Sequence, residues 1–265
     1  MDCAYFTLVS KGYVKGAVCL IKSLKRFTEY PIWVMSIDLD EDDKQLLHDL
    51  GAKIWEGVPR ITSKLAKVRP WHPHDQFCQY CFYKINMWST QWDKIIYLDS
   101  DIIVLKDIDH LFKTEAEFSA VSSCGLSIDV SKIEGFTGRM DVKDIPAKAI
   151  TPYFSKTLFN AGVLVISPNK IVYDKMMSLK DTLVPDSDPS DQGFLNEYYK
   201  DRWNKLDTIY NTSRRVFLNW REKFEEIRDN IHVIHFTGSD SNPWFSNESE
   251  RDELENLWWE YYERK

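Results

Sequence analysis

The first part of the chain alternates between short apolar runs and segments with helical periodicity. The apolar runs have the length and composition of strands and occupy residues 4–10, 31–37, 52–57 and 95–98. Between them, apolar residues recur at the spacing of an amphipathic helix in segments 14–24, 41–51 and 76–92. This order predicts an α/β fold in which helices flank a Rossmann-like, mostly parallel central sheet.

Beyond residue 106 the pattern loosens. Apolar runs that predict three further strands lie at 118–123, 161–167 and 231–236. The segments between them, including 125–157 and 183–193, show no clear period, so we expect them to be irregular. Long irregular segments in a compact enzyme often form substrate loops. The last stretch, 247–265, has the pattern of an acidic amphipathic helix.

The composition is that of a globular protein, with 43% hydrophobic and 28% charged residues. A net charge of −7 argues against binding along a nucleic-acid backbone, because such binding requires a basic face. The first residues lack the basic and apolar regions of a signal peptide. No apolar run approaches the ~18 residues that a membrane helix needs. We therefore expect a cytoplasmic protein without a membrane span.

Two aspartates interrupt the most apolar stretch of the chain. Only Ser100 separates Asp99 from Asp101, and branched apolar residues flank the pair on both sides. Two carboxylates this close raise each other's pKa unless a cation lies between them, and a buried carboxylate without a partner is unfavourable. The pair therefore indicates a Mg²⁺ or Mn²⁺ site that is shared with a substrate phosphate. The alternative is a pair of exposed aspartates in a turn between two strands.

His235 lies near the end of the apolar run 231–236. Strand alternation places its imidazole on the same face as Val233. An imidazole at the end of an apolar strand is suited to complete a metal site with Asp99 and Asp101. The alternative is a core histidine whose ring is satisfied by a backbone carbonyl.

Lys84 and Asn160 are polar residues in otherwise apolar surroundings. A buried ammonium needs an anionic partner, which for Lys84 is either a phosphate or Asp99, unless the side chain extends to the surface. Asn160 precedes Gly162 and an apolar strand. An asparagine at such an edge binds a ligand hydroxyl or is a plain turn residue.

A group of aspartates and a glutamine precedes a predicted helix. Ser190 is expected to cap this helix, with Asp191 and Gln192 in its first turn and Asp188 just before it. These side chains either stabilise the helix start alone or direct oxygen and amide groups at sugar hydroxyls or a reacting carbon.

The order of these motifs is more specific than any one of them. A strand that ends in D-x-D is followed by F-N-A-G-V, D-x-x-D-Q-G-x-L-N and H-F-x-G, with P-W after it. In this order they resemble the glycogenin and galactinol synthase family, glycosyltransferase family 8, along nearly the whole chain. The resemblance implies a single GT-A domain over 1–265, with a nucleotide-binding half at 1–105 and a donor-sugar and acceptor half at 106–265.

The resemblance also implies a role for each matching residue. Asp99, Asp101 and His235 would hold Mn²⁺, or alternatively Mg²⁺, on the donor diphosphate. The residues that would contact the nucleotide sugar are Leu8, Val9, Tyr13, Lys84, Asp99, Ser100, Asp101, Asn160, Ala161 and Gly238. The residues that would act on the reacting sugar are Lys84, Asp188, Asp191 and Gln192.

The implied activity is retaining transfer of a hexose, with glucose as the first choice, from a UDP-sugar to a hydroxyl on a glycan, polyol or protein. One alternative is a UDP-galactose-dependent transferase that acts on a small polyol. Another is a catalytically weak or inactive protein that binds nucleotide sugars. The resemblance leaves a homodimer open.

Two departures from the family pattern bear on the activity. The family usually has a lysine just before P-W, whereas this chain has Asn242, so one positive charge near the diphosphate is missing. Glycogenin glucosylates its own tyrosine a few residues after an I-Y-N, and the same offset here falls on Leu218. No tyrosine lies between Tyr210 and Tyr261. We therefore expect no self-priming of the glycogenin type.

Overall fold

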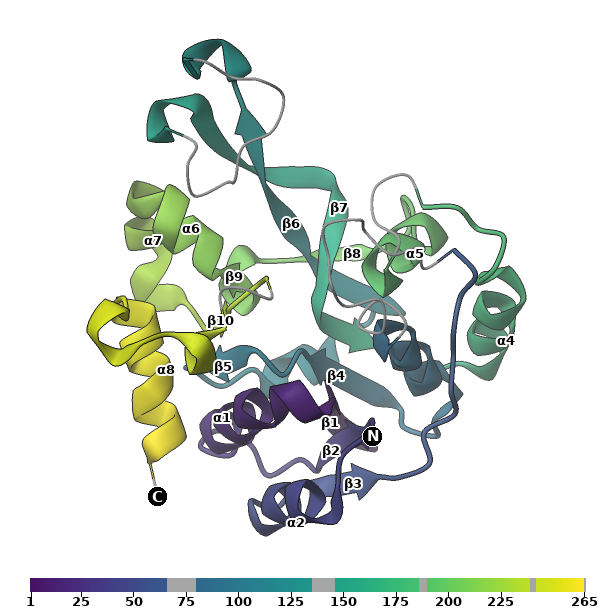
Figure 1. The fold of residues 1–265 in the computed structure, drawn as a ribbon. Helices are drawn as coiled ribbons and strands as arrows, with labels where there is room; N and C mark the ends of the chain where they lie inside the picture. Colours follow the sequence, from purple (N-terminus) through teal and green to yellow (C-terminus); the bar gives the residue numbers. More distant parts are fainter. Residues whose placement is uncertain (66–79, 135–145, 186–189, 239–241, 265) are drawn as a thin grey trace.

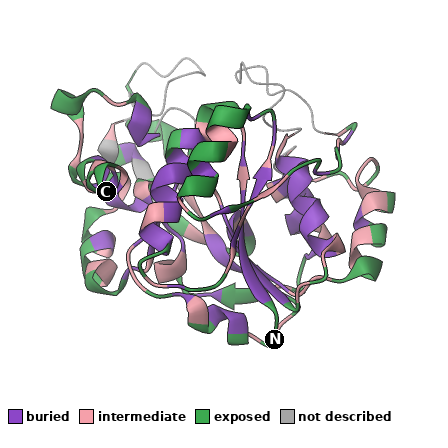
Figure 2. Cartoon of the chain, turned by 90° about the horizontal axis from the view of Figure 1, so that it is seen from below, coloured by how far each residue is buried: buried purple, intermediate pink, exposed green. Residues whose placement is uncertain are grey.

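The computed structural model describes residues 1–65, 80–134, 146–185, 190–238 and 242–264 (Figure 1). It confirms the predicted α/β architecture. One sheet has seven strands in the order β3-β2-β1-β4-β7-β6-β8, and a smaller sheet has the order β5-β10-β9. Helices cover both faces of the large sheet, so its strands are buried while the outer faces of the helices are exposed (Figure 2).

The N-terminal part of the large sheet is parallel, as predicted. Its strands are β1 (Cys3–Val9), β2 (Ile32–Ser36), β3 (Lys53–Trp55) and β4 (Lys94–Leu98). The helices that connect the first three strands are α1 (Val14–Leu24) and α2 (Glu41–Asp49). All of these elements lie within a few residues of their predicted positions, because each has an apolar pattern that matches its own period.

Alternation along the strands builds a core on each side of the sheet. On β1, Cys3 and Tyr5 pack in the core that includes α1, whereas Ala4 and Phe6 pack in the core on the opposite face. A parallel sheet buried on both faces has apolar residues at consecutive positions, and these strands show that composition.

The aromatic segment predicted as a helix over 76–92 differs from the prediction in its geometry. In the described residues it forms a 3-10 helix, η2 (Phe82–Ser89). A 3-10 helix brings residues three apart onto one side. This repeat directs Cys81 and Lys84 to the same side, where both line the pocket described below.

The prediction that residues 125–157 are irregular is wrong at both ends. β6 (Phe118–Ile128) and β7 (Ile150–Ile166) extend far beyond the apolar runs that predicted them and pair in an antiparallel hairpin. β7 also pairs antiparallel with β4, and β8 (Asn204–Leu206) pairs parallel with β6. The outer part of the hairpin has many exposed residues, so it lacks the apolar alternation that identifies a half-buried strand.

The remaining elements complete the second sheet and the outer layers. The strands are β5 (Ile102–Val104), β9 (Thr212–Ser213) and β10 (Val233–His235). The helices are α4 (Lys170–Leu179), α5 (Asp191–Tyr198), α6 (Arg214–Asn219), α7 (Arg221–Ile227) and α8 (Glu253–Glu263), and the last confirms the predicted C-terminal helix. Short 3-10 helices occupy Lys11–Tyr13, Asp109–Lys113, Val130–Lys132, Ala147–Ala149, Thr208–Tyr210, Arg228–Asn230, Pro243–Phe245 and Glu248–Glu250.

The proposed division into halves at residue 105 stays a prediction. Pairing between β4 and β7 joins strands from both halves in one sheet. Among the described residues, none of the helices has the length and apolar character needed to cross a membrane.

Candidate active site

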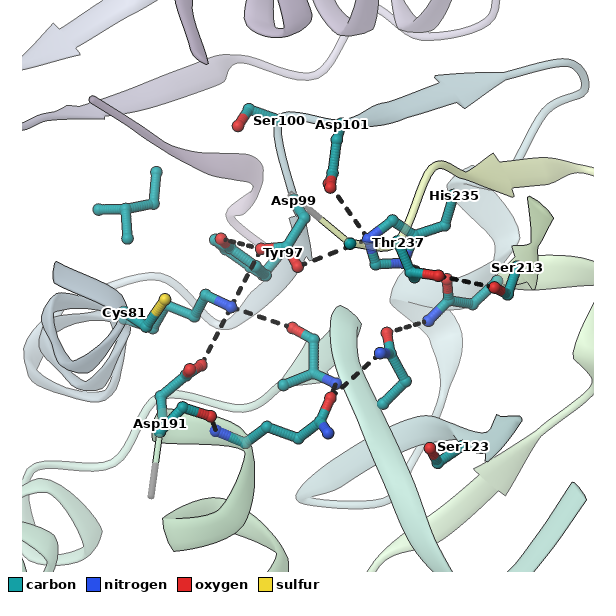
Figure 3. A pocket seen from close by; sticks show the side chains of 18 of the residues that line it. Cys81, Tyr97, Asp99, Ser100, Asp101, Ser123, Asp191, Ser213, His235 and Thr237 are labelled. Atoms are coloured by element: carbon teal, nitrogen blue, oxygen red, sulfur yellow. Dashed lines mark hydrogen bonds and ion pairs between the residues drawn. The ribbon is translucent and has the colours of Figure 1, made fainter. Parts of the chain in front are cut away.

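A pocket with a volume of about 320 Å³ opens at the carboxyl ends of β1 and β4. In an open α/β sheet this edge is the usual place for ligands. Segments far apart in the sequence contribute its walls, including the turn after β4, the middle of β7, the start of α5 and the end of β10. Figure 3 shows the side chains of Asp99 and Asp101 turned toward His235 within this pocket.

The structure brings together Asp99, Asp101 and His235, the three residues predicted from the sequence as metal ligands, and their role as ligands stays a prediction. β4 ends at Leu98, so both aspartates lie in the turn before β5. The antiparallel pairing of β10 with β5 places His235 opposite Ile102, next to this turn. One ligand atom from each of the three side chains lies within 4.8 Å of the others. Two carboxylates and one imidazole at this separation suit a divalent cation such as Mn²⁺.

The imidazole of His235 is buried and is held in one orientation. Its Nδ1 lies 2.9 Å from the amide oxygen of Asn211, so Nδ1 carries a proton and Nε2 faces the carboxylates. Nε2 lies 3.1 Å from Asp101 and 3.8 Å from Asp99. Burial alone would lower the pKa of His235, but the charges of these carboxylates outweigh it and raise the pKa above its ordinary value.

Amide side chains connect His235 to the first turn of α5. Asn211 donates to the side-chain oxygen of Asn160 at 2.8 Å, and Asn160 donates to that of Gln192 at 3.1 Å. The oxygen of Gln192 also accepts the backbone N–H of Ala161 at 3.1 Å. The predicted residues Asn160, Ala161 and Gln192 therefore belong to one hydrogen-bond network, which links the imidazole of His235 to the first turn of α5.

One interpretation of the sequence was that Lys84 extends to the surface. The structure contradicts it. The side chain of Lys84 is buried, and its ammonium lies 3.0 Å from a carboxylate oxygen of Asp99 and 3.0 Å from one of Asp191. Burial alone would lower the pKa of Lys84, but the two carboxylates raise it well above its ordinary value.

The same ion pairs act on Asp99. Burial alone would raise the pKa of this carboxyl group, but the charges of Lys84 and His235 hold the pKa below its usual value. Tyr97 donates a further hydrogen bond to Asp99 at 2.6 Å. Through its contacts with Asp99 and Asp191, Lys84 thus links the turn after β4 to the first turn of α5.

An irregularity in β7 shapes the centre of the pocket. The register between β6 and β7 shifts between Ala120 and Val121, which leaves extra β7 residues after Asn160. Bulges of this kind commonly redirect side chains near active sites. Next to it, Gly162 allows a close approach, since a Cβ atom there would lie 2.2 Å from Cε1 of His235.

The predicted cap of α5 is confirmed. The side chain of Ser190 accepts the backbone N–H of Gln192, and Asp191 is buried in the first turn. Both Asp191 and Gln192 line the pocket. Asp188 lies outside the described residues, so its proposed role stays a prediction.

The predicted nucleotide-binding residues lie in two environments. Leu8, Tyr13, Ser100 and Gly238 line the pocket, and Gly238 has a φ of 109°, which suits glycine. Val9 is fully buried in the core and does not line the pocket. The contact of Val9 with a nucleotide therefore stays a prediction that would have to involve its backbone.

Asn242, which replaces the usual lysine of the family pattern, is buried and hydrogen-bonds to Tyr13. It does not line the pocket. A neutral, buried amide at this position does not replace the missing positive charge.

Asn211 is a site residue that sequence reasoning missed. Its only visible signal was an N-x-S/T sequon, which gave no reason to place it beside His235. The contact arises because β9 pairs in parallel with β10, which sets Ser213 beside His235. Arg215 and Ser122 also line the pocket without having been predicted.

Comparison with known proteins shows the family to which the chain belongs. Residues 5–248 match the family model described as glycosyl transferase family 8. Galactinol synthase 6 of Arabidopsis thaliana is 31% identical over 285 residues, which cover 98% of this chain and 80% of the relative. Galactinol synthase 2 of Solanum lycopersicum is 29% identical, with 98% and 80% covered.

Solved glycosyltransferase structures share the fold. GlyE of Streptococcus pneumoniae TIGR4 superposes with a TM-score of 0.65 at 21% identity, covering 99% of this chain and 61% of that chain. The galactosyltransferase LgtC, solved in complex with donor and acceptor sugar analogs, superposes with a TM-score of 0.59 at 17% identity, covering 98% and 95%.

Proposed function

Because the chain belongs to glycosyl transferase family 8, we propose that it transfers a hexose from a UDP-sugar to an acceptor hydroxyl and retains the anomeric configuration. The observation that carries this proposal is the metal-ligand cluster of Asp99, Asp101 and His235 in the pocket that also contains Lys84. The oxygen and nitrogen donors of this cluster fit Mn²⁺, and Mg²⁺ is the alternative.

Negative charge that develops on the leaving diphosphate raises the energy of the transition state in such a reaction. A divalent cation bound by the three ligands supplies Lewis-acid stabilisation of that charge. Lys84 holds Asp99 in its ionised form, and its ammonium fixes the position of Asp99 relative to Asp191. Asp191, Gln192 and Asn160 present oxygen and amide groups to the hydroxyls of the donor sugar, which positions its anomeric carbon.

In the proposed step the bond between the anomeric carbon and the diphosphate oxygen breaks, and the acceptor oxygen bonds to the same face of that carbon. The acceptor proton passes to the leaving diphosphate. The charges in the pocket support this route over a covalent intermediate. Within the described part of the pocket, Asp99 and Asp191 are paired with Lys84 and Asp101 is paired with His235, so no carboxylate is free to act as a nucleophile.

The sequence alone favoured glucose as the transferred sugar, and the relatives favour a second candidate. Two curated relatives at 31% and 29% identity are named galactinol synthases. Their names suggest a galactosyl donor and a small polyol acceptor. Both candidates use the same site, because the two sugars differ in the orientation of one hydroxyl.

A UDP-release assay tests the proposal. The protein is incubated with Mn²⁺ and either UDP-glucose or UDP-galactose, with myo-inositol and a glycan library as acceptors. We expect acceptor-dependent UDP release that Asp101→Ala abolishes, and an NMR spectrum of the product that shows the donor's anomeric configuration.

Three results would contradict the proposal in different ways. Tight UDP-sugar binding without turnover would indicate a nucleotide-sugar-binding protein, the alternative that Asn242 raises. An inverted product would exclude retention. A trapped glycosyl-enzyme, detected by mass spectrometry, would exclude the same-face route.

A further inference from the structure

The pocket has a second end, away from the region that the nucleotide would occupy. We call it the β6 end and define it by Ser122, Ser123 and Cys124 on β6 with Ser213 and Arg215 at the start of α6. Leu8 of β1 marks the opposite end. β4 and β7 lie between β1 and β6 in the sheet, which separates the two ends by roughly 14 Å at the usual strand spacing.

Arg215 gives the β6 end a positive charge. Its side chain is exposed and lines the pocket. Among the residues that the structure describes, no carboxylate forms an ion pair with its guanidinium. The adjacent Arg214 differs, because it binds Asp252 at 2.6 Å and Glu255 at 3.1 Å.

No group in the described pocket neutralises this charge. The carboxylates that line the pocket are engaged with Lys84 and His235. Cys124 lies close to Arg215, but burial raises the pKa of its thiol even though the arginine opposes this. The thiol therefore stays neutral and is not a counter-ion.

Several side chains with hydroxyl groups line the pocket together with Arg215. Ser122 is 4% exposed, and its buried hydroxyl has no hydrogen-bond partner within the described ranges. The hydroxyls of Ser213 and Thr237 lie 2.8 Å apart and face one another, as Figure 3 shows. Serine and threonine hydroxyls both donate and accept, so they suit a ligand that is itself rich in hydroxyls.

We propose that the β6 end is the acceptor subsite and that Arg215 selects a polyhydroxylated acceptor carrying a phosphate or carboxylate group. A guanidinium binds either anion through two parallel hydrogen bonds. The serine and threonine hydroxyls hold the ring, and the metal cluster lies between this ring and the nucleotide end. The proposal rests on the proposed transferase function, since it assigns the acceptor of that reaction.

Matched acceptors test this proposal. Wild-type protein with Mn²⁺ and a UDP-hexose is assayed with glucose, glucose 6-phosphate and glucuronate, and with myo-inositol and its monophosphate. Binding of each compound in the presence of UDP is measured separately by calorimetry. We expect kcat/KM for the anionic acceptors to exceed that for their neutral partners by about 10- to 100-fold, the range of charge-assisted hydrogen bonds.

Variants locate the effect. Arg215→Gln is expected to remove the preference by raising the acceptor KM, with a change of less than about twofold in the donor KM, while Arg215→Lys keeps part of it because the charge remains. Ser122→Ala is expected to raise KM for every acceptor. Lys175→Gln removes an exposed charge on α4, outside the pocket, and serves as the control.

The outcomes distinguish failure of the acceptor subsite from failure of the proposed transferase function. Transfer to neutral acceptors with no anion preference would overturn the role of Arg215 while leaving the transferase intact. A rise in the donor KM of Arg215→Gln without an acceptor effect would also overturn it, because Arg215 would then contact the diphosphate. Arg215-dependent binding of the anionic compounds without UDP release from any donor would support the subsite and contradict the transferase.

Discussion

Asp101 is the carboxylate nearest to Nε2 of His235, at 3.1 Å, and unlike Asp99 it is not also paired with Lys84. Asp101→Asn keeps the shape of the side chain and removes its charge. We expect Mn²⁺ affinity to fall by about 10²- to 10³-fold, because a charged ligand is lost. UDP release should fall by about the same factor, because the leaving group loses electrostatic stabilisation. Calorimetric titration with Mn²⁺ and the UDP-release assay measure the two effects.

Asp42→Asn is the matched control for this prediction. Asp42 lies exposed on α2, outside the pocket, so its neutralisation removes the same charge from the protein without touching the cluster. Equal losses in both variants would show that net charge, and not the metal site, controls the activity.

Lys84 determines whether the buried carboxylates are tolerated at all. Lys84→Met leaves Asp99 and Asp191 without their shared partner. We expect the free energy of unfolding at neutral pH to fall by about 3–5 kcal/mol, because an uncompensated buried charge is strongly unfavourable. Urea denaturation followed by circular dichroism measures this loss.

The double variant Lys84→Met/Asp191→Asn tests the cause of that loss. It removes one of the two stranded charges, so part of the lost stability should return. If the double variant is less stable than Lys84→Met, the lysine contributes through packing and not through charge.

Residue 162 must be glycine because a side chain there would collide with the imidazole of His235. Gly162→Ala places a methyl group 2.2 Å from Cε1 of the imidazole, so the ring or the strand must move. We expect Mn²⁺ to bind about 10- to 100-fold more weakly, as when the support of a metal-bound histidine is disturbed. Gly12→Ala is the control, because no atom lies within 4 Å of a Cβ built there. Unchanged Mn²⁺ binding in Gly162→Ala would mean that the ring has another position compatible with the metal.

At the scale of elements, the N-terminus of α5 combines a helix cap with two pocket residues of proposed function. Ser190 caps the helix whose first turn carries Asp191 and Gln192. Ser190→Ala should reduce the free energy of unfolding by about 1 kcal/mol. It should also slow the reaction by about tenfold or more, because small displacements of positioning groups are costly.

Asn169→Ala separates these two effects. Asn169 caps α4 in the same way but lies outside the pocket. A similar loss of stability with unchanged kcat is expected there. If both variants slow the reaction equally, general destabilisation explains the result for Ser190.

Elements also differ in how far the sequence predicts them. β1, α1, β2 and β4 were predictable because each buries a face whose period is visible in the chain. The outer part of β7 was not, since exposed positions carry no period. The grouping of Asp99, Asp101 and His235 was predictable because charged side chains in apolar runs require a partner. The positions of Asn211 and Arg215 depend on β9 pairing with β10 and on α6 lying beside β7, which no local pattern encodes.

At the scale of the whole molecule, the candidate metal site of Asp99, Asp101 and His235 joins the two sheets. Asp99 follows β4 of the large sheet, and His235 belongs to β10 of the small one. A ligand that binds only the folded state stabilises it by RT ln(1 + [L]/Kd). Mn²⁺ at about 100 times its Kd should add about 2.7 kcal/mol and raise Tm by roughly 5–10 °C.

Differential scanning calorimetry with and without a chelator measures this shift, and Asp101→Asn should abolish it. An equal rise in that variant would place the stabilising Mn²⁺ at a different site.

The distance in sequence between the metal ligands has a consequence for protein synthesis. The ribosome makes Asp99 and Asp101 long before His235, and Asn211, which orients the imidazole, also comes late in the chain. A nascent chain can form the parallel strands of the first half while its metal site still lacks the nitrogen ligand. In the proposed scheme, binding of Mn²⁺ by all three ligands therefore requires that His235 has been synthesised and that β10 has paired with β5.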